Sequence, residues 1–169
     1  PVPDELHSFS TKLREHMYMD VKGAMEFLAA YPGIDRLRIG ILAPQFSAEP
    51  AVRAMRETVD LPTRALVLLG GHGLSKESKE YLAEVETPIY TGASIMDRPV
   101  LMDMTEVYVN SKNPDSFLFA PVAAERGMNL VNHSNLNRPA QTDIEVTNLM
   151  QWLETQVRNY GRVRAISFK

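Results

Sequence analysis

Apolar residues recur at helical spacing in the first part of the chain. They stand three or four positions apart, at Leu6, Phe9, Leu13, Met17, Val21, Met25 and Leu28. This spacing is typical of the buried face of an α-helix, and Tyr31-Pro32-Gly33 ends the pattern. The sequence predicts a helical segment over residues 1–33, as one bent helix or two consecutive helices.

A strand and a helix are predicted next. Apolar residues at 37–42 favour a short strand, and Ser47 is placed to cap a helix that runs to residue 59. Glu49 and Pro50 fall in the first turn of this helix, where an acidic side chain and a proline are both favourable. This is the first β-α pair.

The second pair contains the most informative stretch of the chain. An apolar strand at 65–69 runs into Gly70-Gly71-His72-Gly73, and Ser75 then caps a helix over 76–85. A third short strand is expected at 88–90. A strand, a glycine turn and a helix place backbone N–H groups and one histidine at the end of a sheet, where α/β proteins usually bind ligands.

Apolar runs separated by turn residues characterise the next part of the chain. They cover residues 100–109, 117–123 and 128–131, with Asn113-Pro114-Asp115 and Arg126-Gly127 as turn signals. Such spacing favours three further strands. We expect some of them to run antiparallel to the others.

One more helix is marked near the end of the chain. Its apolar stripe consists of Val146, Leu149, Met150, Leu153, Val157 and Tyr160. Thr142 and Glu145 fit a capping box at its start, and Gly161 fits a C-cap before a final strand at 163–168. Together these elements predict a single α/β domain over 1–169, with a mixed β-sheet, helices on both faces and a β/α core over 34–169.

Composition narrows the range of functions. The chain has 169 residues, a formal net charge of −3 and no cysteine. This length suffices for one buried core, and the charge does not favour nucleic acid as a partner. The absence of cysteine excludes disulfides and thiol catalysis and fits a cytoplasmic location. No apolar stretch reaches the roughly 20 residues of a membrane span, so we expect no membrane association.

Two segments carry polar groups at predicted strand ends. In the first, Gly70, Gly71 and Gly73 would let the backbone approach an anion, with Ser75 at the helix start and His72 as a donor or proton carrier. The alternative is a tight β-α turn in which the glycines only supply positive φ angles. These two interpretations stay open at the level of sequence.

The second segment follows the predicted strand at 128–131. Asn132, His133, Ser134 and Asn135 could hydrogen-bond a phosphate or a sugar, with His133 as nucleophile or general acid and base. A turn in which these side chains cap their own backbone is the alternative. We expect a ligand cleft where this loop meets the 70–75 turn.

The sequence indicates no cofactor and no metal site. The Walker spacing is missing, and the third glycine of a dinucleotide motif would fall where Lys76 stands. No two of the four histidines have the i, i+4 spacing of a helical zinc site. Asp97, Asp103 and Glu106 could join a hard-cation site, but a solvated acidic edge is the more common arrangement.

The order of elements resembles the phospholipase D-like superfamily. Phe46-Ser47 closes the first predicted strand as Phe-Ser does there, the segment 132–136 resembles Gly-Ser-x-Asn-Leu, and Glu145 lies near the family's acidic position. Met104-Thr105-Glu106 stands where the family has His-x-Lys. The resemblance therefore implies a catalytically inactive or altered member, without the histidine that forms a phosphohistidine.

Three hypotheses on function follow. The first is a non-catalytic or divergent α/β binding or assembly module that recognises a phosphate-bearing ligand or a protein partner. The second is a phosphodiester hydrolase, nuclease-like, that uses His72 and His133 as an acid and base pair. The third is a homo-oligomer. Nine methionines are either core residues, which is the more common case, or an adaptable binding surface; among them are Met17, Met19, Met25, Met96, Met102 and Met104.

Overall fold

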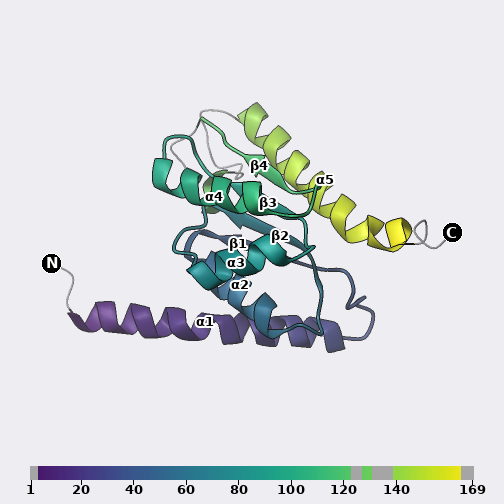
Figure 1. Cartoon of the computed structure of the whole chain (residues 1–169), viewed down its shortest axis with the longest axis horizontal. Coiled ribbons are helices and arrows are strands. Elements are labelled where there is room, and N and C mark those ends of the chain that lie inside the picture. Colours follow the sequence, from purple (N-terminus) through teal and green to yellow (C-terminus); the bar gives the residue numbers. More distant parts are fainter. Residues whose placement is uncertain (1–3, 123–126, 131–138, 165–169) are drawn as a thin grey trace.

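Four parallel strands form the centre of the computed structural model (Figure 1). They are β1 (Ile39–Pro44), β2 (Thr63–Leu69), β3 (Ile89–Gly92) and β4 (Phe117–Phe119), in the spatial order β1-β2-β3-β4. The structure describes residues 4–122, 127–130 and 139–164, and side chains at 16–122, 127, 130 and 145–158. The predicted α/β class is confirmed.

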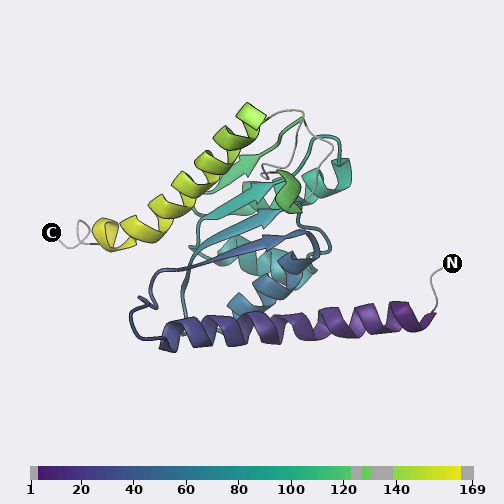
Figure 2. The same ribbon diagram turned by 180° about the vertical axis from the view of Figure 1, so that it is seen from behind.

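Helices cover both faces of this sheet (Figure 1, Figure 2). One face packs on α2 (Ala48–Glu57), α3 (Lys76–Glu84) and α4 (Arg98–Asn110), which connect successive strands. Each new strand is added on the same side of the previous one. Right-handed connections between such strands place all of their helices on the same face of the sheet. The other face packs on α5 (Pro139–Arg164).

Strand β2 lies at the middle of the core, and all seven of its residues are buried. Leu66 and Leu68 pack toward α2, α3 and α4, whereas Val67 and Leu69 pack toward α5. A strand that is apolar on both sides is typical of a parallel sheet between two helical layers. The unbroken apolar run in the sequence is explained by this position.

An aromatic cluster seals the α5 face. The ring centroid of Tyr90 lies 5.2 Å from that of Phe117, 6.3 Å from that of Phe119 and 5.3 Å from that of Trp152. The Trp152 indole N–H donates to the Asp115 carbonyl oxygen at 2.9 Å. These contacts attach α5 to the β3–β4 side of the sheet.

The helical segment at the start of the chain is a single helix, α1 (Asp4–Ala30). Its second half packs on α2, where Met25 is buried beside Thr58 and the Arg53 guanidinium lies 3.5 Å from the ring centroid of Tyr18. Its first half extends beyond the other ribbons (Figure 1, Figure 2). The predicted helix is therefore present as an outer layer on α2.

Two strand predictions in the second half are wrong. Residues 100–109 belong to α4, in which Met104 and Val107 are buried three positions apart and Pro99 stands in the first turn. The apolar run at 128–131 was also expected to be a strand, but 127–130 form a 3-10 helix, η2 (Gly127–Leu130). An apolar run fits either a strand or a buried helix face. Residues 100–109 pack against β3 and α3, and these contacts select the helix.

Three further details differ from the prediction. Every described strand pair is parallel, so the expected antiparallel strands are not found among the described residues. Helix α5 begins at Pro139, before the predicted cap at Thr142, and continues through Gly161 to Arg164; the rest of the strand predicted at 163–168 lies outside the described residues. Ser47 stands at the N-cap position of α2 as predicted, but it also ends the 3-10 helix η1 (Gln45–Ser47), and its hydroxyl donates to the Pro44 carbonyl oxygen at 2.6 Å rather than capping α2.

A test of the core packing is Gly71→Ala. A Cβ at this position would lie 3.0 Å from the Ala48 Cβ and 3.3 Å from the Met104 Cε. We expect the free energy of unfolding in urea to fall by about 1–3 kcal/mol, the usual cost of overpacking. Gly23→Ala is the control, because its Cβ would meet nothing within 4 Å in α1 and should stabilise the protein by about 0.5–1 kcal/mol. Equal effects of the two changes would contradict this packing.

A second test uses the buried Tyr90 hydroxyl. Burial, and to a smaller extent the charge of Glu145, raises the pKa of Tyr90 well above its usual value. The folded state thus favours the neutral phenol, and its contribution to stability is complete below about pH 10 and is lost as the pH rises further. We expect Tyr90→Phe to flatten the alkaline loss of stability measured by urea unfolding, whereas Tyr108→Phe, at an exposed site, should leave it unchanged.

Candidate functional site

The carboxyl ends of β1, β2 and β3 meet at one edge of the sheet. They are followed by η1, by the 70–75 turn and by the loop at 93–97. Open α/β sheets usually bind ligands at this edge, in the crevice where the strand order reverses. The described sheet has the sequential order β1-β2-β3-β4 and contains no such reversal. Any site here is built from the loops themselves.

The three predicted glycines have structural roles in the turn. Gly70 and Gly73 adopt φ angles of 64° and 72°, which side chains rarely tolerate. Gly71 is buried between Ala48 of α2 and Met104 of α4, where a side chain would not fit. The glycines are therefore explained by the chain path and by helix packing.

Ser75 caps α3 as predicted, but its polar groups are also bound to an internal anion. Its hydroxyl accepts from the Ser78 N–H at 3.1 Å, and its own N–H and hydroxyl each donate to the Glu49 carboxylate at 2.9 Å. The Ser78 hydroxyl donates to the same carboxylate at 3.0 Å. Glu49 thus places a negative charge at the start of α3, where the helix dipole favours one.

The other predicted site residues are not brought together by the described part of the chain. His72 is exposed at the tip of the turn. His133, Asn132, Ser134 and Asn135 lie outside the described residues. The histidine pair and the cleft between the two segments therefore remain predictions.

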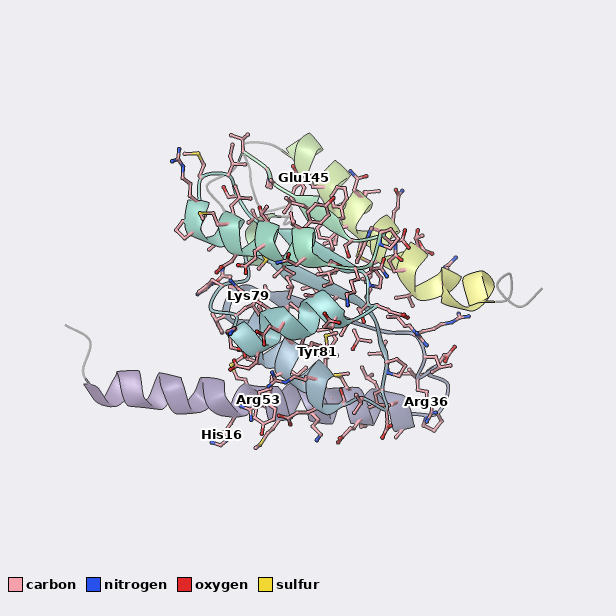
Figure 3. The ribbon with its side chains drawn as sticks, viewed as in Figure 1. His16, Arg36, Arg53, Lys79, Tyr81 and Glu145 are labelled. Atoms are coloured by element: carbon pink, nitrogen blue, oxygen red, sulfur yellow. The ribbon has the colours of Figure 1, made fainter. Side chains whose placement is uncertain are left out.

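Two of the three acidic residues considered as a cation site, Asp103 and Glu106, are engaged by a lysine. Lys79 lies between α3 and α4 (Figure 3), and its Nζ is 2.8 Å from Asp103 Oδ1 and 2.7 Å from Glu106 Oε2. Hydrogen bonds to these two carboxylates raise the pKa of Lys79. No group of three potential metal ligands occurs among the described residues. The three side chains therefore form an ion-pair link between two helices.

Large apolar side chains are exposed along the carboxyl edge. Phe46 follows β1, Ile95 and Met96 follow β3, and Met102 lies in the second turn of α4. Met96 and Met102 are 70% and 73% exposed, whereas Met104, two positions further along α4, is fully buried. We name Phe46, Ile95, Met96 and Met102 the methionine patch.

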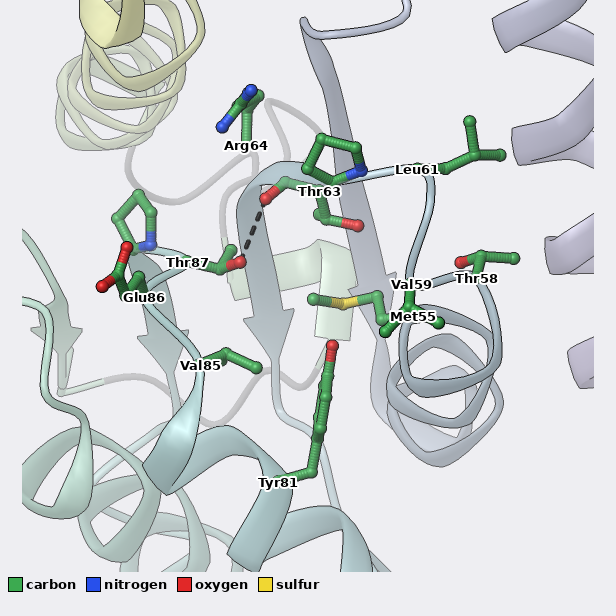
Figure 4. A pocket seen from close by; sticks show the side chains of 12 residues that line it. Met55, Thr58, Val59, Leu61, Thr63, Arg64, Tyr81, Val85, Glu86 and Thr87 are labelled. Carbon is green, nitrogen blue, oxygen red and sulfur yellow. Dashed lines mark hydrogen bonds between the residues drawn. The ribbon is translucent and has the colours of Figure 1, made fainter. Parts of the chain in front are cut away.

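The opposite edge of the sheet contains a pocket that sequence reasoning missed. Its volume is about 310 Å³, and it lies between the end of α2, the first residues of β2, α3 and the residues that precede β3 (Figure 4). Its walls include Met55, Val59, Pro62, Thr63, Tyr81 and Val85. These residues are far apart in the sequence and follow no motif, so only the fold shows that they share a pocket.

Among the described residues, four with a hydroxyl group line this pocket: Thr58 and Thr87 donate to backbone carbonyl oxygens, and the other two are Thr63 and Tyr81. Thr63 is buried, and its Oγ1 has no hydrogen-bond partner in the part of the chain that the structure describes. The hydroxyl end of Tyr81 is directed toward Met55 and the start of β2 (Figure 4). Burial raises the pKa of Tyr81, and the positive charge of Arg56 opposes this rise. Tyr81 is therefore a neutral donor near pH 7.

Comparison of the chain with protein-family models, with curated proteins and with solved structures gave no match. The resemblance to the phospholipase D-like superfamily therefore stays a prediction. Phe46 and Ser47 do lie directly after β1, in η1, but Met104-Thr105-Glu106 lies on a helix rather than beside a strand. No helix in the described ranges combines the length and apolar character of a membrane span.

The role of Glu49 is tested by Glu49→Ala. Loss of the carboxylate leaves one N–H and two hydroxyl groups at the start of α3 without their charged partner. We expect the free energy of unfolding to fall by about 2 kcal/mol, as measured by urea denaturation. Glu80→Ala is the control, because Glu80 forms an exposed pair with Lys76 and should change stability by less than about 1 kcal/mol. A fall no larger than that of the control would show that Glu49 does not stabilise α3.

Proposed function

We propose that the protein is a non-catalytic binding module that docks a protein partner on the methionine patch. The observation that carries this proposal is the exposure of Met96 and Met102, whereas Met25, Met55 and Met104 are buried. Methionine side chains are flexible and polarisable, and they suit surfaces that adapt to a partner. Ile95 and Met96 are neighbours in the chain, and apolar side chains exposed side by side are typical of interaction sites.

A protein partner is favoured over a phosphate-bearing ligand by the position of Glu49. The amide and hydroxyl groups that would receive a phosphate at the 70–75 turn donate to this carboxylate. A phosphate there would meet a negative charge and would have to displace three hydrogen bonds. An apolar interface at the same edge needs no anion at the turn, and it leaves the three hydrogen bonds to Glu49 in place.

A non-catalytic role is favoured by the bonding of the serine hydroxyls at this edge. Those of Ser75 and Ser78 donate to Glu49, and that of Ser47 donates to a backbone carbonyl. Because Ser75 Oγ also accepts from the Ser78 N–H, these bonds hold the start of α3, and the hydroxyls of Ser75 and Ser78 are explained by the helix cap without a catalytic role. We place the module in the cytoplasm, since a chain without cysteine fits a reducing compartment.

The proposal is tested by site-directed photo-crosslinking in cells that express the protein. A photoreactive residue is placed at position 95 inside the patch or, as the matched control, at the exposed position 109 on α4. We expect one defined partner protein to be crosslinked from position 95 only. Met96→Ser combined with Met102→Ser should lower its yield about tenfold or more, because buried anchors dominate interface energies.

Other outcomes decide against this assignment. Equal crosslinking from positions 95 and 109, or a yield at position 95 that the two serine substitutions leave unchanged, would mean that the patch is not the docking surface. A crosslink between two copies of this chain would identify the patch as a self-association surface and contradict docking of a different protein. Circular dichroism of the doubly substituted variant shows whether the fold is retained.

A further inference from the structure

We propose that α1 is the surface through which two copies of this chain associate, with their α1 helices side by side and antiparallel. The pairing does not use the methionine patch and is independent of the function proposed there. Three features of α1 support it: a first half that projects from the rest of the fold, an apolar stripe on the outer side of the helix, and the charges near its middle.

The apolar positions of α1 do not stay on one side of the helix. Each residue advances about 100° round an α-helix, so a step of four residues moves about 40° past a full turn. From Phe9 to Met25 the apolar positions follow one another at such steps. Leu13 and Met25 are therefore about 120° apart round the helix. Met25 is buried on the side that packs on α2, whereas the positions before Met17 fall on an outer side.

The outer side is also apolar in the second half of α1. By the same helical repeat, Phe27 and Tyr31 continue the line of positions that begins at Leu6. Phe27 and Tyr31 are 63% and 53% exposed, and their ring centroids lie 5.6 Å apart. We name the outer stripe as Leu6, Phe9, Leu13, Met17, Phe27 and Tyr31. A line of large apolar residues along the outside of a helix is typical of an interaction surface.

A second copy fits this stripe because of the way α1 projects. The second half of α1 packs on α2, whereas the first half extends beyond the other ribbons (Figure 1, Figure 2). In an antiparallel pair, the first half of each helix lies along the second half of the other. Leu6 and Phe9 then meet Phe27 and Tyr31 of the second copy, and a two-fold axis passes near Met17. Both halves of the interface are identical, as in a C2 dimer.

Charges near the middle of α1 favour the antiparallel orientation. Asp20 falls on the outer side and is exposed, so a parallel pair would place two aspartates against each other. In an antiparallel pair, Asp20 lies opposite residues 14–17 of the second copy. Arg14 and His16 flank the stripe there, Glu15 falls on the far side of the helix, and Figure 3 shows His16 on the side of α1 away from the sheet. The carboxylate thus meets an arginine and an imidazole N–H.

The area of such a pair is that of a specific interface. Phe and Tyr side chains bury roughly 150–250 Å² each, so Phe27 and Tyr31 of two copies, at their exposed fractions, still have roughly 350–600 Å² to bury. This is about a third of the roughly 1,600 Å² of a standard interface. The residues that cover these rings lose a similar area, and the remaining positions of the stripe add to it.

The experiment is sedimentation equilibrium of the full chain at micromolar concentrations. We expect a mass of twice the 19.0 kDa of one chain. Phe27→Ser combined with Tyr31→Ser should raise the dissociation constant of the dimer about a hundredfold or more, because buried aromatic anchors dominate interface energies. Met19→Ser is the matched control: Met19 is 51% exposed on the same helix but lies away from both the stripe and α2, so this change should leave the dimer intact.

Disulfide trapping tests the orientation. The chain has no cysteine, so Ser10→Cys and Ala24→Cys each introduce a single thiol on the outer side of α1. In the antiparallel pair, position 10 of one copy lies beside position 24 of the other, and mild oxidation of a mixture of the two variants should link them. Equal positions are about 20 Å apart, and a disulfide needs Cα atoms within about 7 Å, so each variant alone should stay unlinked.

Sedimentation of the unsubstituted chain as a monomer would overturn the proposal. A dimer that keeps its affinity with both Phe27→Ser and Tyr31→Ser would show that another surface is used, and efficient linking of each cysteine variant alone would contradict the antiparallel pair. Leu13→Glu lies in the projecting half and should dissociate the dimer without changing urea unfolding of the sheet, which separates association from folding. None of these outcomes depends on crosslinking at the methionine patch, so the two proposals can fail separately.

Discussion

Burial of β2 on both faces is the constraint on which the rest of the structure depends. Leu66 and Leu68 need a helical layer on one side, and Val67 and Leu69 need one on the other. The three connecting helices supply the first layer, and α5 supplies the second. Each connection adds the next strand on the same side of the sheet, so all three connecting helices lie on one face and a separate helix has to cover the other. The aromatic cluster around Tyr90 attaches that helix, α5.

The same arrangement determines what each edge of the sheet offers. At the carboxyl edge, α2 and α3 begin side by side, so Glu49 in the first turn of α2 reaches the start of α3. The anion position that the turn would provide is thus filled by the chain itself. At the amino edge, a pocket lies between the end of α2 and Tyr81 of α3. The buried Thr63 hydroxyl is next to this pocket.

Local sequence signals predicted most of the α/β core. The strand at 65–69, the cap at Ser75 and the helix after it depend on neighbouring residues alone, and the structure confirms them. The run at 100–109 misled the prediction because its valines favour strands while its length and spacing also fit a helix; contacts with β3 and α3 decide between the two. The bond from Ser75 to Glu49 spans 26 positions. No local pattern reveals a contact of that kind, and the same holds for the pocket.

An internal carboxylate, that of Glu49, occupies the start of α3 in the place of a ligand. The most direct measurement is a titration of the ¹⁵N-labelled protein with inorganic phosphate, followed through the amide signals of Ser75 and Ser78. Because the Ser75 amide donates to Glu49 and that of Ser78 donates to the Ser75 hydroxyl, we predict that neither signal moves. A saturable shift of both signals at low phosphate concentration would contradict this account and restore the turn as a phosphate-binding site.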